Sequence, residues 1–172
     1  TVSSTINRPA DTTGTRTNFL VYIDLAKKFS IEYPNNWQKR IIMDTPQKFQ
    51  MEWSPSRTLG ASPALAQASL RIEPNSNGWT QDQLNLDIVS STRAYTGTSI
   101  WVVNQGNIQI GSMNGYRVIL QNQSDGLPYY RQIISLVRGD QIITIEYRSN
   151  DRNYNQDIAD LEAMLTTMKF LP

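Results

Sequence analysis

Residues 129–147 read YYRQIISLVRGDQIITIEY and contain two β-rich runs separated by one short turn. Strand-forming residues dominate 129–137 and 141–147, and Arg138-Gly139-Asp140 between them has the composition of a hairpin turn. Strands joined by so short a turn pair antiparallel, because parallel strands need a long crossover connection. The stretch therefore predicts an antiparallel hairpin inside a larger sheet.

Further strands are expected before this hairpin in the chain. They lie at 19–23, 28–33, 41–43, 49–53, 70–73, 101–104, 108–110 and 116–121. In 28–33 the apolar residues alternate with polar ones, which is the period of a half-buried strand. Turn residues are expected to separate the later strands at Gln105-Gly106-Asn107, Asn114-Gly115 and Asp125-Gly126. These short connections again favour antiparallel pairing.

Two helices interrupt the strands. Thr80-Gln81-Asp82-Gln83 is a capping box that starts the first helix, and Gly97 is expected to end it. The second helix is expected over 154–168, where apolar residues recur at helical spacing. The order of strands, helix, strands and helix predicts an α+β fold in which helices pack on a central antiparallel sheet.

The first 17 residues differ in composition from the rest. Residues 1–17 are rich in Thr, Ser, Asn and Pro, so we predict a flexible leader that precedes one domain over 18–172. This leader is also a candidate arm for contacting a partner. The chain starts with Thr, and we expect an exported protein whose signal segment was removed. The alternative is a cytosolic domain with a trimmed start.

Composition excludes several classes of function. The chain has no Cys and no His, so Ser-His-Asp and Cys-His catalysis are impossible within it. Its formal net charge of +1 predicts no pull towards nucleic acid. The sequence contains no glycine-rich phosphate loop and no apolar run long enough for a transmembrane segment. We therefore expect a binding protein that is not an enzyme.

One cluster of residues is a candidate for partner binding. Lys27, Lys28, Lys39 and Arg40 flank the strand at 28–33, and Trp37 follows that strand. Together they are expected to form a docking patch for an acidic protein surface. The alternative is ordinary solvated charge.

Two further groups allow both a functional and a structural interpretation. Trp37, Trp53, Trp79 and Trp101 include candidates for a sugar or partner platform, or are core and rim residues. Asp157 and Asp160 are three residues apart, so they could share a helix face and bind calcium, or they are part of a solvated face.

Three stretches of the chain resemble the PsbP-like (Mog1/PsbP) family. The first is FSIEYPNNW at 29–37, which is similar to the family's opening strand and its Y-P-x-x-W turn. The second is the hairpin segment NGYRVILQ at 114–121. The third is IITIEY at 142–147, followed by a polar segment and a helix that leads to Met168-Lys169-Phe170. The resemblance covers roughly residues 22–171.

The resemblance implies an αβα sandwich with a central antiparallel sheet. The best-known members are extrinsic proteins of photosystem II in the thylakoid lumen, where they help the oxygen-evolving complex to retain calcium and chloride. The stretch AQASLRI at 66–72 lacks the family's Glu-Asn pair, and the histidines proposed as metal ligands are absent. The chain is therefore expected to be a divergent cyanobacterial or plastid-type relative. No cofactor is expected beyond weak calcium binding, and its metal ligands are undetermined.

Two functional hypotheses follow. The first is a monomeric, non-enzymatic extrinsic accessory protein, located in the thylakoid lumen or on the periplasmic side of a membrane. It would bind a membrane protein complex, photosystem II on its oxygen-evolving side, and aid its assembly or stability. The alternative is an extracytoplasmic ligand- or protein-recognition domain of a bacterial envelope or sensor protein. An enzyme is a third hypothesis, which the missing His and Cys disfavour.

Overall fold

The computed structural model describes residues 2–6, 18–58, 66–93, 100–122, 130–150 and 154–172. The first half contains β1 (Val2–Ile6), β2 (Phe19–Asp24), β3 (Phe29–Pro34), β4 (Trp37–Asp44), β5 (Phe49–Pro55), η1 (Ser56–Thr58) and β6 (Ala66–Pro74). The second half contains α1 (Gln81–Arg93), β7 (Ile100–Ile110), β8 (Met113–Asn122), β9 (Tyr130–Arg138), β10 (Gln141–Ser149), α2 (Tyr154–Thr167) and β11 (Lys169–Phe170). The α+β class is confirmed.

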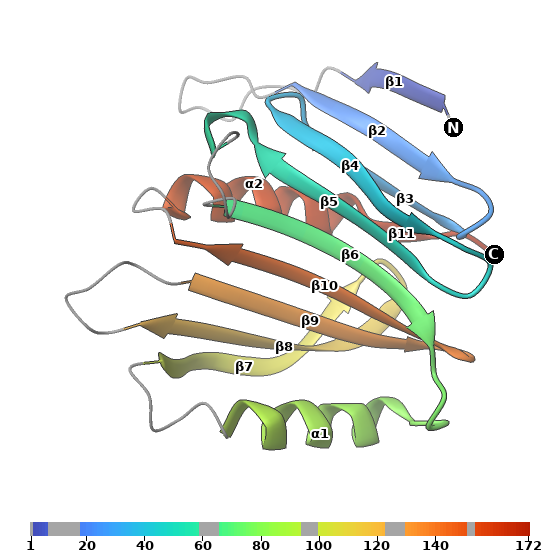
Figure 1. Ribbon diagram of the computed structural model, residues 1–172, viewed down its shortest axis with the longest axis vertical. Helices are drawn as coiled ribbons and strands as arrows, with labels where there is room; N and C mark the ends of the chain where they lie inside the picture. Colours follow the sequence, from blue (N-terminus) through green and yellow to red (C-terminus); the bar gives the residue numbers. More distant parts are fainter. Residues whose placement is uncertain (1, 7–17, 59–65, 94–99, 123–129, 151–153) are drawn as a thin grey trace.

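The strands divide between two sheets, where the sequence predicted one central sheet. The large sheet has the order β4-β5-β6-β10-β9-β8-β7, and the small one has the order β1-β2-β3-β11 (Figure 1). All pairings in both sheets are antiparallel. The hairpin predicted at 129–147 is present as β9 and β10, in the middle of the large sheet. It turns at Gly139, where φ is +60°.

The main core lies between the large sheet on one side and β3 with α2 on the other (Figure 1). Alternate residues of each strand point into it, because successive side chains of a strand lie on opposite faces. In β5 these are Phe49, Met51 and Trp53, all at most 1% exposed. The buried face of α2, with Leu161 and Leu165, closes the core. Burial of each such side chain stabilises the fold by about 1.5–3 kcal/mol.

Helix α1 packs on β8 and β9, on the face of the large sheet opposite α2. The predicted capping box is present: the Thr80 N–H donates to Gln83 Oε1 at 2.8 Å, and the Gln83 N–H donates to Thr80 Oγ1 at 3.3 Å. The helix ends at Arg93, and Gly97, its expected end, lies outside the described residues. Helix α2 matches the expected range of 154–168 to within one residue.

Two predicted turns are strand instead. Gly106 lies inside the continuous strand β7, and Gly115 lies inside β8, whose turn from β7 falls at Gly111 and Ser112. A Cβ on Gly115 would lie 2.7 Å from Leu136 Cδ2. Close packing, and not turn geometry, is therefore the reason for a glycine at 115. The expected Asp125-Gly126 turn is outside the described residues.

Part of the predicted flexible leader is a β-strand. Val2–Ile6 forms β1 and pairs along its whole length with β2, from Val2 opposite Ile23 to Ile6 opposite Phe19. Backbone pairing needs no apolar side chains, so the polar composition of this segment did not reveal the strand. Residues 7–17 of the expected leader lie outside the described part of the chain.

Candidate functional site

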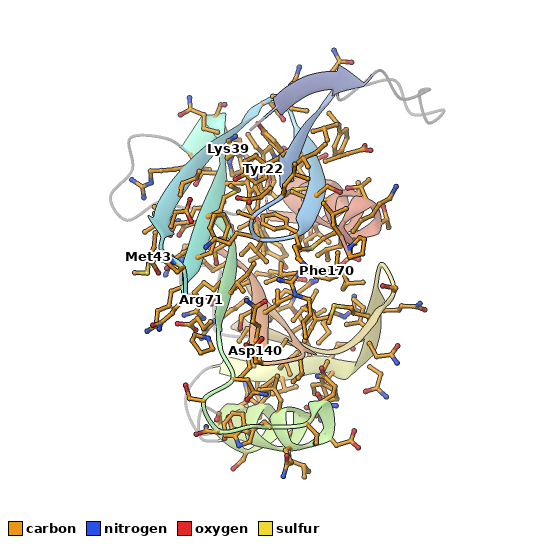
Figure 2. All side chains as sticks on the ribbon, turned by 90° about the vertical axis from the view of Figure 1, so that its right-hand side faces the viewer. Tyr22, Lys39, Met43, Arg71, Asp140 and Phe170 are labelled. Atoms are coloured by element: carbon orange, nitrogen blue, oxygen red, sulfur yellow. The ribbon has the colours of Figure 1, made fainter. Side chains whose placement is uncertain are left out.

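A polar groove lies on the face of the large sheet opposite α2. Among the described elements, α1 packs over β8 and β9 and leaves the strands β5, β6 and β10 open on this face. The groove has a volume of about 160 Å3. It is lined by Gln50, Glu52, Gln67, Ser69, Arg71, Glu146 and Arg148. Figure 2 shows Arg71 on the side of the large sheet away from Phe170, which lies with the core layer.

Strand register builds this groove. Ser69 of β6 pairs with Glu52 of β5 on one side and with Glu146 of β10 on the other. These residues point away from the core because their chain neighbours Ala68 and Leu70 point into it. Serine is the shortest side chain in the row, so the longer residues around it form the walls.

Both carboxylates of the groove already have partners. The Arg40 guanidinium donates to Glu52 Oε2 at 3.0 Å, and Gln50 Nε2 donates to Glu52 Oε1 at 3.1 Å. Arg131 Nε donates to Glu146 Oε1 at 2.9 Å. Glu146 Oε2 lies 3.8 Å from the Arg71 guanidinium. The acceptors of the groove are therefore largely occupied.

The arginine donors are less completely used. Arg148 directs Nε and one terminal nitrogen at the same oxygen, Gln67 Oε1, at 3.2 and 2.7 Å. Within the described part of the chain, Arg71 makes only the 3.8 Å ion pair. A guanidinium has five N–H donors. The groove therefore suits a ligand that supplies acceptor oxygens.

The basic residues that the sequence grouped do not form one free patch. The Lys27 ammonium lies 3.2 Å from Asp44 Oδ1 and also donates to the Thr45 carbonyl. Lys28 is exposed in the turn between β2 and β3, with φ at +57°. The Lys27 and Lys28 carbonyls also accept hydrogen bonds from the Arg138 guanidinium, at 3.0 and 3.1 Å, which link this turn to the end of β9.

Lys39 and Arg40 are consecutive in β4 and point to opposite faces of the large sheet. Lys39 Nζ lies 4.3 Å from the centre of the Tyr22 ring, on the core side, where burial lowers the pKa of Lys39 (Figure 2). Arg40 pairs with Glu52 beside the polar groove. The expectation of one patch failed because strand alternation separates neighbours.

Trp37 is a core residue, which corrects its assignment to the partner-binding surface. Its side chain is 2% exposed, and its ring centre lies 6.4 Å from that of Tyr147. The indole Nε1 lies near the Asp160 carboxyl but does not meet hydrogen-bond geometry. Trp53 is also buried, at 1%, whereas Trp101 at the edge strand β7 is 50% exposed. A tryptophan platform is therefore not formed by Trp37 and Trp53.

Asp157 is buried. The interpretation of Asp157 and Asp160 as part of a solvated helix face is therefore wrong for Asp157. Its carboxylate is 1% exposed and accepts two hydrogen bonds from Arg57, both at 2.7 Å, and one from the Tyr147 hydroxyl at 2.8 Å. These contacts tie η1, β10 and α2 together. They also occupy the oxygens that a calcium ion would need. No group of three or more acidic side chains suited to a metal occurs among the residues that the structure describes.

Sequence reasoning missed the groove residues Arg71, Gln67 and Arg148. Only Arg71 lay inside a predicted strand, at 70–73, whereas Gln67 and Arg148 lay outside the strands predicted at 70–73 and 141–147. The missing information was that β5, β6 and β10 are neighbours, since β6 and β10 are about 70 residues apart in the chain. Within the described ranges, no helix has the length and apolar character to cross a membrane.

Comparisons with known proteins support the fold. No family model and no curated protein matches the sequence. Among solved structures, cyanobacterial PsbP (CyanoP) from Synechocystis sp. PCC 6803 is similar, with a TM-score of 0.59 and 10% identity. That match covers 95% of this chain and 98% of CyanoP.

Two further solved structures share the fold. LpqN, involved in cell envelope biogenesis of Mycobacterium tuberculosis, has a TM-score of 0.52 and 7% identity, over 99% of this chain and 91% of that one. The immunity protein TplEi of the T6SS from Pseudomonas aeruginosa has a TM-score of 0.54 and 10% identity, over 98% of this chain and 54% of that one. At these identities the likeness establishes a PsbP-like fold, and not a function.

Proposed function

We propose that this chain is a non-catalytic accessory protein that binds a membrane protein complex on its extracytoplasmic side. The observation that carries the proposal is the open polar groove over β5, β6 and β10, where arginine donors exceed their partners. Among the described elements, α1 covers β8 and β9 on this face of the large sheet and leaves β5, β6 and β10 accessible to a partner. A pre-formed surface of this kind can bind without rearrangement.

The specific form of the proposal is an extrinsic protein of photosystem II on its oxygen-evolving side. The sequence resemblance to PsbP-like proteins favours it, and so does the similarity to CyanoP over nearly the full length of both chains. The location would then be the thylakoid lumen or the periplasmic side of the membrane. The protein would aid assembly or stability of the complex.

The groove chemistry argues against catalysis. Ser69 is the only hydroxyl-bearing residue among the described residues that line it, and the carboxylates on either side, Glu52 and Glu146, are each paired with an arginine. A serine nucleophile needs a general base that is free to accept its proton. The chain has no histidine for that role.

A second candidate is an extracytoplasmic recognition domain of a bacterial envelope or sensor protein. The shared fold with LpqN and TplEi favours it, since LpqN is involved in cell envelope biogenesis and TplEi is an immunity protein of the T6SS. Both candidates require a protein partner or ligand at the surface. They differ in which membrane components would be captured.

The absence of cysteine allows a direct test. Ser69→Cys places a unique thiol on the floor of the groove, to which a photo-crosslinker can be attached. Ser112→Cys, in the exposed turn between β7 and β8, is the matched control. After illumination with native membranes, we expect adducts with a membrane-complex subunit from position 69 and not from position 112.

The identity of the adducts separates the candidates. Photosystem II subunits support the first, and envelope proteins support the second. Absence of any membrane adduct from either position, with both variants folded, would refute an accessory role at a membrane complex.

A further inference from the structure

We propose that the groove recognises an extended acidic segment of the protein partner, whose carboxylates bind Arg71 and Arg148. This inference rests on the proposed function and names the chemistry of the partner at the same site. It follows from the charges, donors and shape of the open face.

The open face carries a local excess of positive charge. It displays four arginines, Arg40, Arg71, Arg131 and Arg148, against three glutamates, Glu52, Glu73 and Glu146. Two glutamates are held by the outer arginines, Glu52 by Arg40 and Glu146 by Arg131. Among the described residues, Arg148 is left in the groove without a carboxylate partner, and Arg71 shares Glu146 with Arg131 at the longer distance of 3.8 Å.

The two groove arginines are positioned to accept a ligand. Counting the described residues alone, Arg148 has the neutral Gln67 amide oxygen as its one partner, and Arg71 has one ion pair that is longer than a hydrogen bond. Arg–carboxylate pairs are commonly bidentate and roughly twice as strong as neutral hydrogen bonds. A carboxylate at either guanidinium would therefore accept stronger hydrogen bonds from the N–H groups than a neutral acceptor does.

Strand pairing places two of the arginines directly opposite each other. Arg148 of β10 is the register partner of Arg131 of β9. Like charges at opposite positions of neighbouring strands destabilise a sheet. Glu146 relieves this repulsion at Arg131, and an anion bound at Arg148 would relieve the remainder.

The shape favours an extended segment over a small molecule. Gln67, Ser69 and Arg71 follow one another along β6, and four residues of a strand span about 13 Å. The groove is shallow and open along this line, at about 160 Å3. An extended peptide can lie along it and place alternate side chains over the arginines, because its side chains also alternate with period two.

The test uses a labelled peptide of alternating Glu and Ser, with a Gln–Ser peptide of equal length as its uncharged counterpart. Binding is measured by fluorescence anisotropy at low salt. The groove variant is the double substitution Arg71→Gln and Arg148→Gln. The control is the double substitution Lys48→Gln and Lys169→Gln, which removes the same charge from exposed positions outside the groove.

We expect the wild type and the lysine control to bind the Glu–Ser peptide equally. The groove variant should lose about tenfold or more in affinity, because it removes the charge-assisted hydrogen bonds of both guanidiniums to the peptide carboxylates. The Gln–Ser peptide should not bind. Circular dichroism melting of each variant checks that it is folded, which is expected because both groove arginines are solvent-accessible.

Three outcomes would overturn the inference. The groove variant could bind as tightly as the wild type, or both double variants could lose the same affinity, which would indicate a general charge effect. Alternatively, the groove arginines could bind vesicles of anionic phospholipid and not the peptide, which would assign the groove to lipid headgroups. The cross-linking test is separate: adducts at position 69 without peptide binding would retain the accessory function and reject the acidic segment.

Discussion

Replacement of Trp37 by alanine tests the packing that joins the Y-P-x-x-W turn to the core. The Trp37 side chain is 2% exposed and packs beside Tyr147. Burial of an aromatic side chain removes about 200 Å2 from water, which corresponds to about 5 kcal/mol. A compact unfolded chain already buries part of that area, which reduces the value to about 4 kcal/mol. We therefore expect Trp37→Ala to lower the free energy of unfolding by about 3–5 kcal/mol.

Urea unfolding followed by far-UV circular dichroism measures this loss. In a chain of this size, about 4 kcal/mol corresponds to a fall in Tm of about 8–16 °C. Trp37→Phe is the matched control: it keeps most of the ring and removes the Nε1–H group, which has no hydrogen-bond partner in the described part of the chain. We expect a loss below about 1.5 kcal/mol for Trp37→Phe. A loss below about 1 kcal/mol for Trp37→Ala would show that Trp37 does not anchor the core.

Three other outcomes are expected. Gly115→Ala should cost about 1–3 kcal/mol, because its Cβ would clash with Leu136, whereas Gly106→Ala, with open space around it, should change the urea midpoint little. Burial raises the pKa of Asp160 above its ordinary 3.8, so its charge destabilises the fold as pH rises through the raised pKa. Asp160→Asn should therefore be more stable than the wild type at pH 7, and this advantage should vanish near pH 3.8. Equal stability of the two proteins at pH 7 would contradict the raised pKa of Asp160. Chelator should leave Tm unchanged, and a fall of several degrees would reveal a structural ion.

The sequence was sufficient where local chemistry decides the structure. The capping box at Thr80 and Gln83 satisfies backbone groups within one turn, so it was readable and is present. The alternation in β3 and β5 was likewise readable, because one buried face imposes a period of two. Gly115 shows the limit: its sequence context is typical of a turn, but its role depends on Leu136 of a different strand.

The candidate site was beyond sequence reasoning for the same physical reason. The grouping of Lys39 with Arg40 relied on their adjacency in the chain, and a strand sends adjacent side chains to opposite faces. Arg71 and Arg148 lie far apart in the chain and meet in one groove because β6 pairs with β10. Pairing between distant strands depends on backbone hydrogen bonds that every residue can make, so side-chain identity encodes it weakly.

From the sequence alone came the α+β class, the antiparallel hairpins, the two helices and the absence of histidine and cysteine chemistry. These properties depend on composition and on contacts between near neighbours in the chain. Tertiary structure alone decided the division into two sheets, the burial of Trp37 and Asp157, and the groove that gathers the arginines of β6 and β10. Each of these arises from contacts between segments that are distant in the chain, where many alternative pairings have similar local energies and only the packing of the whole core selects one.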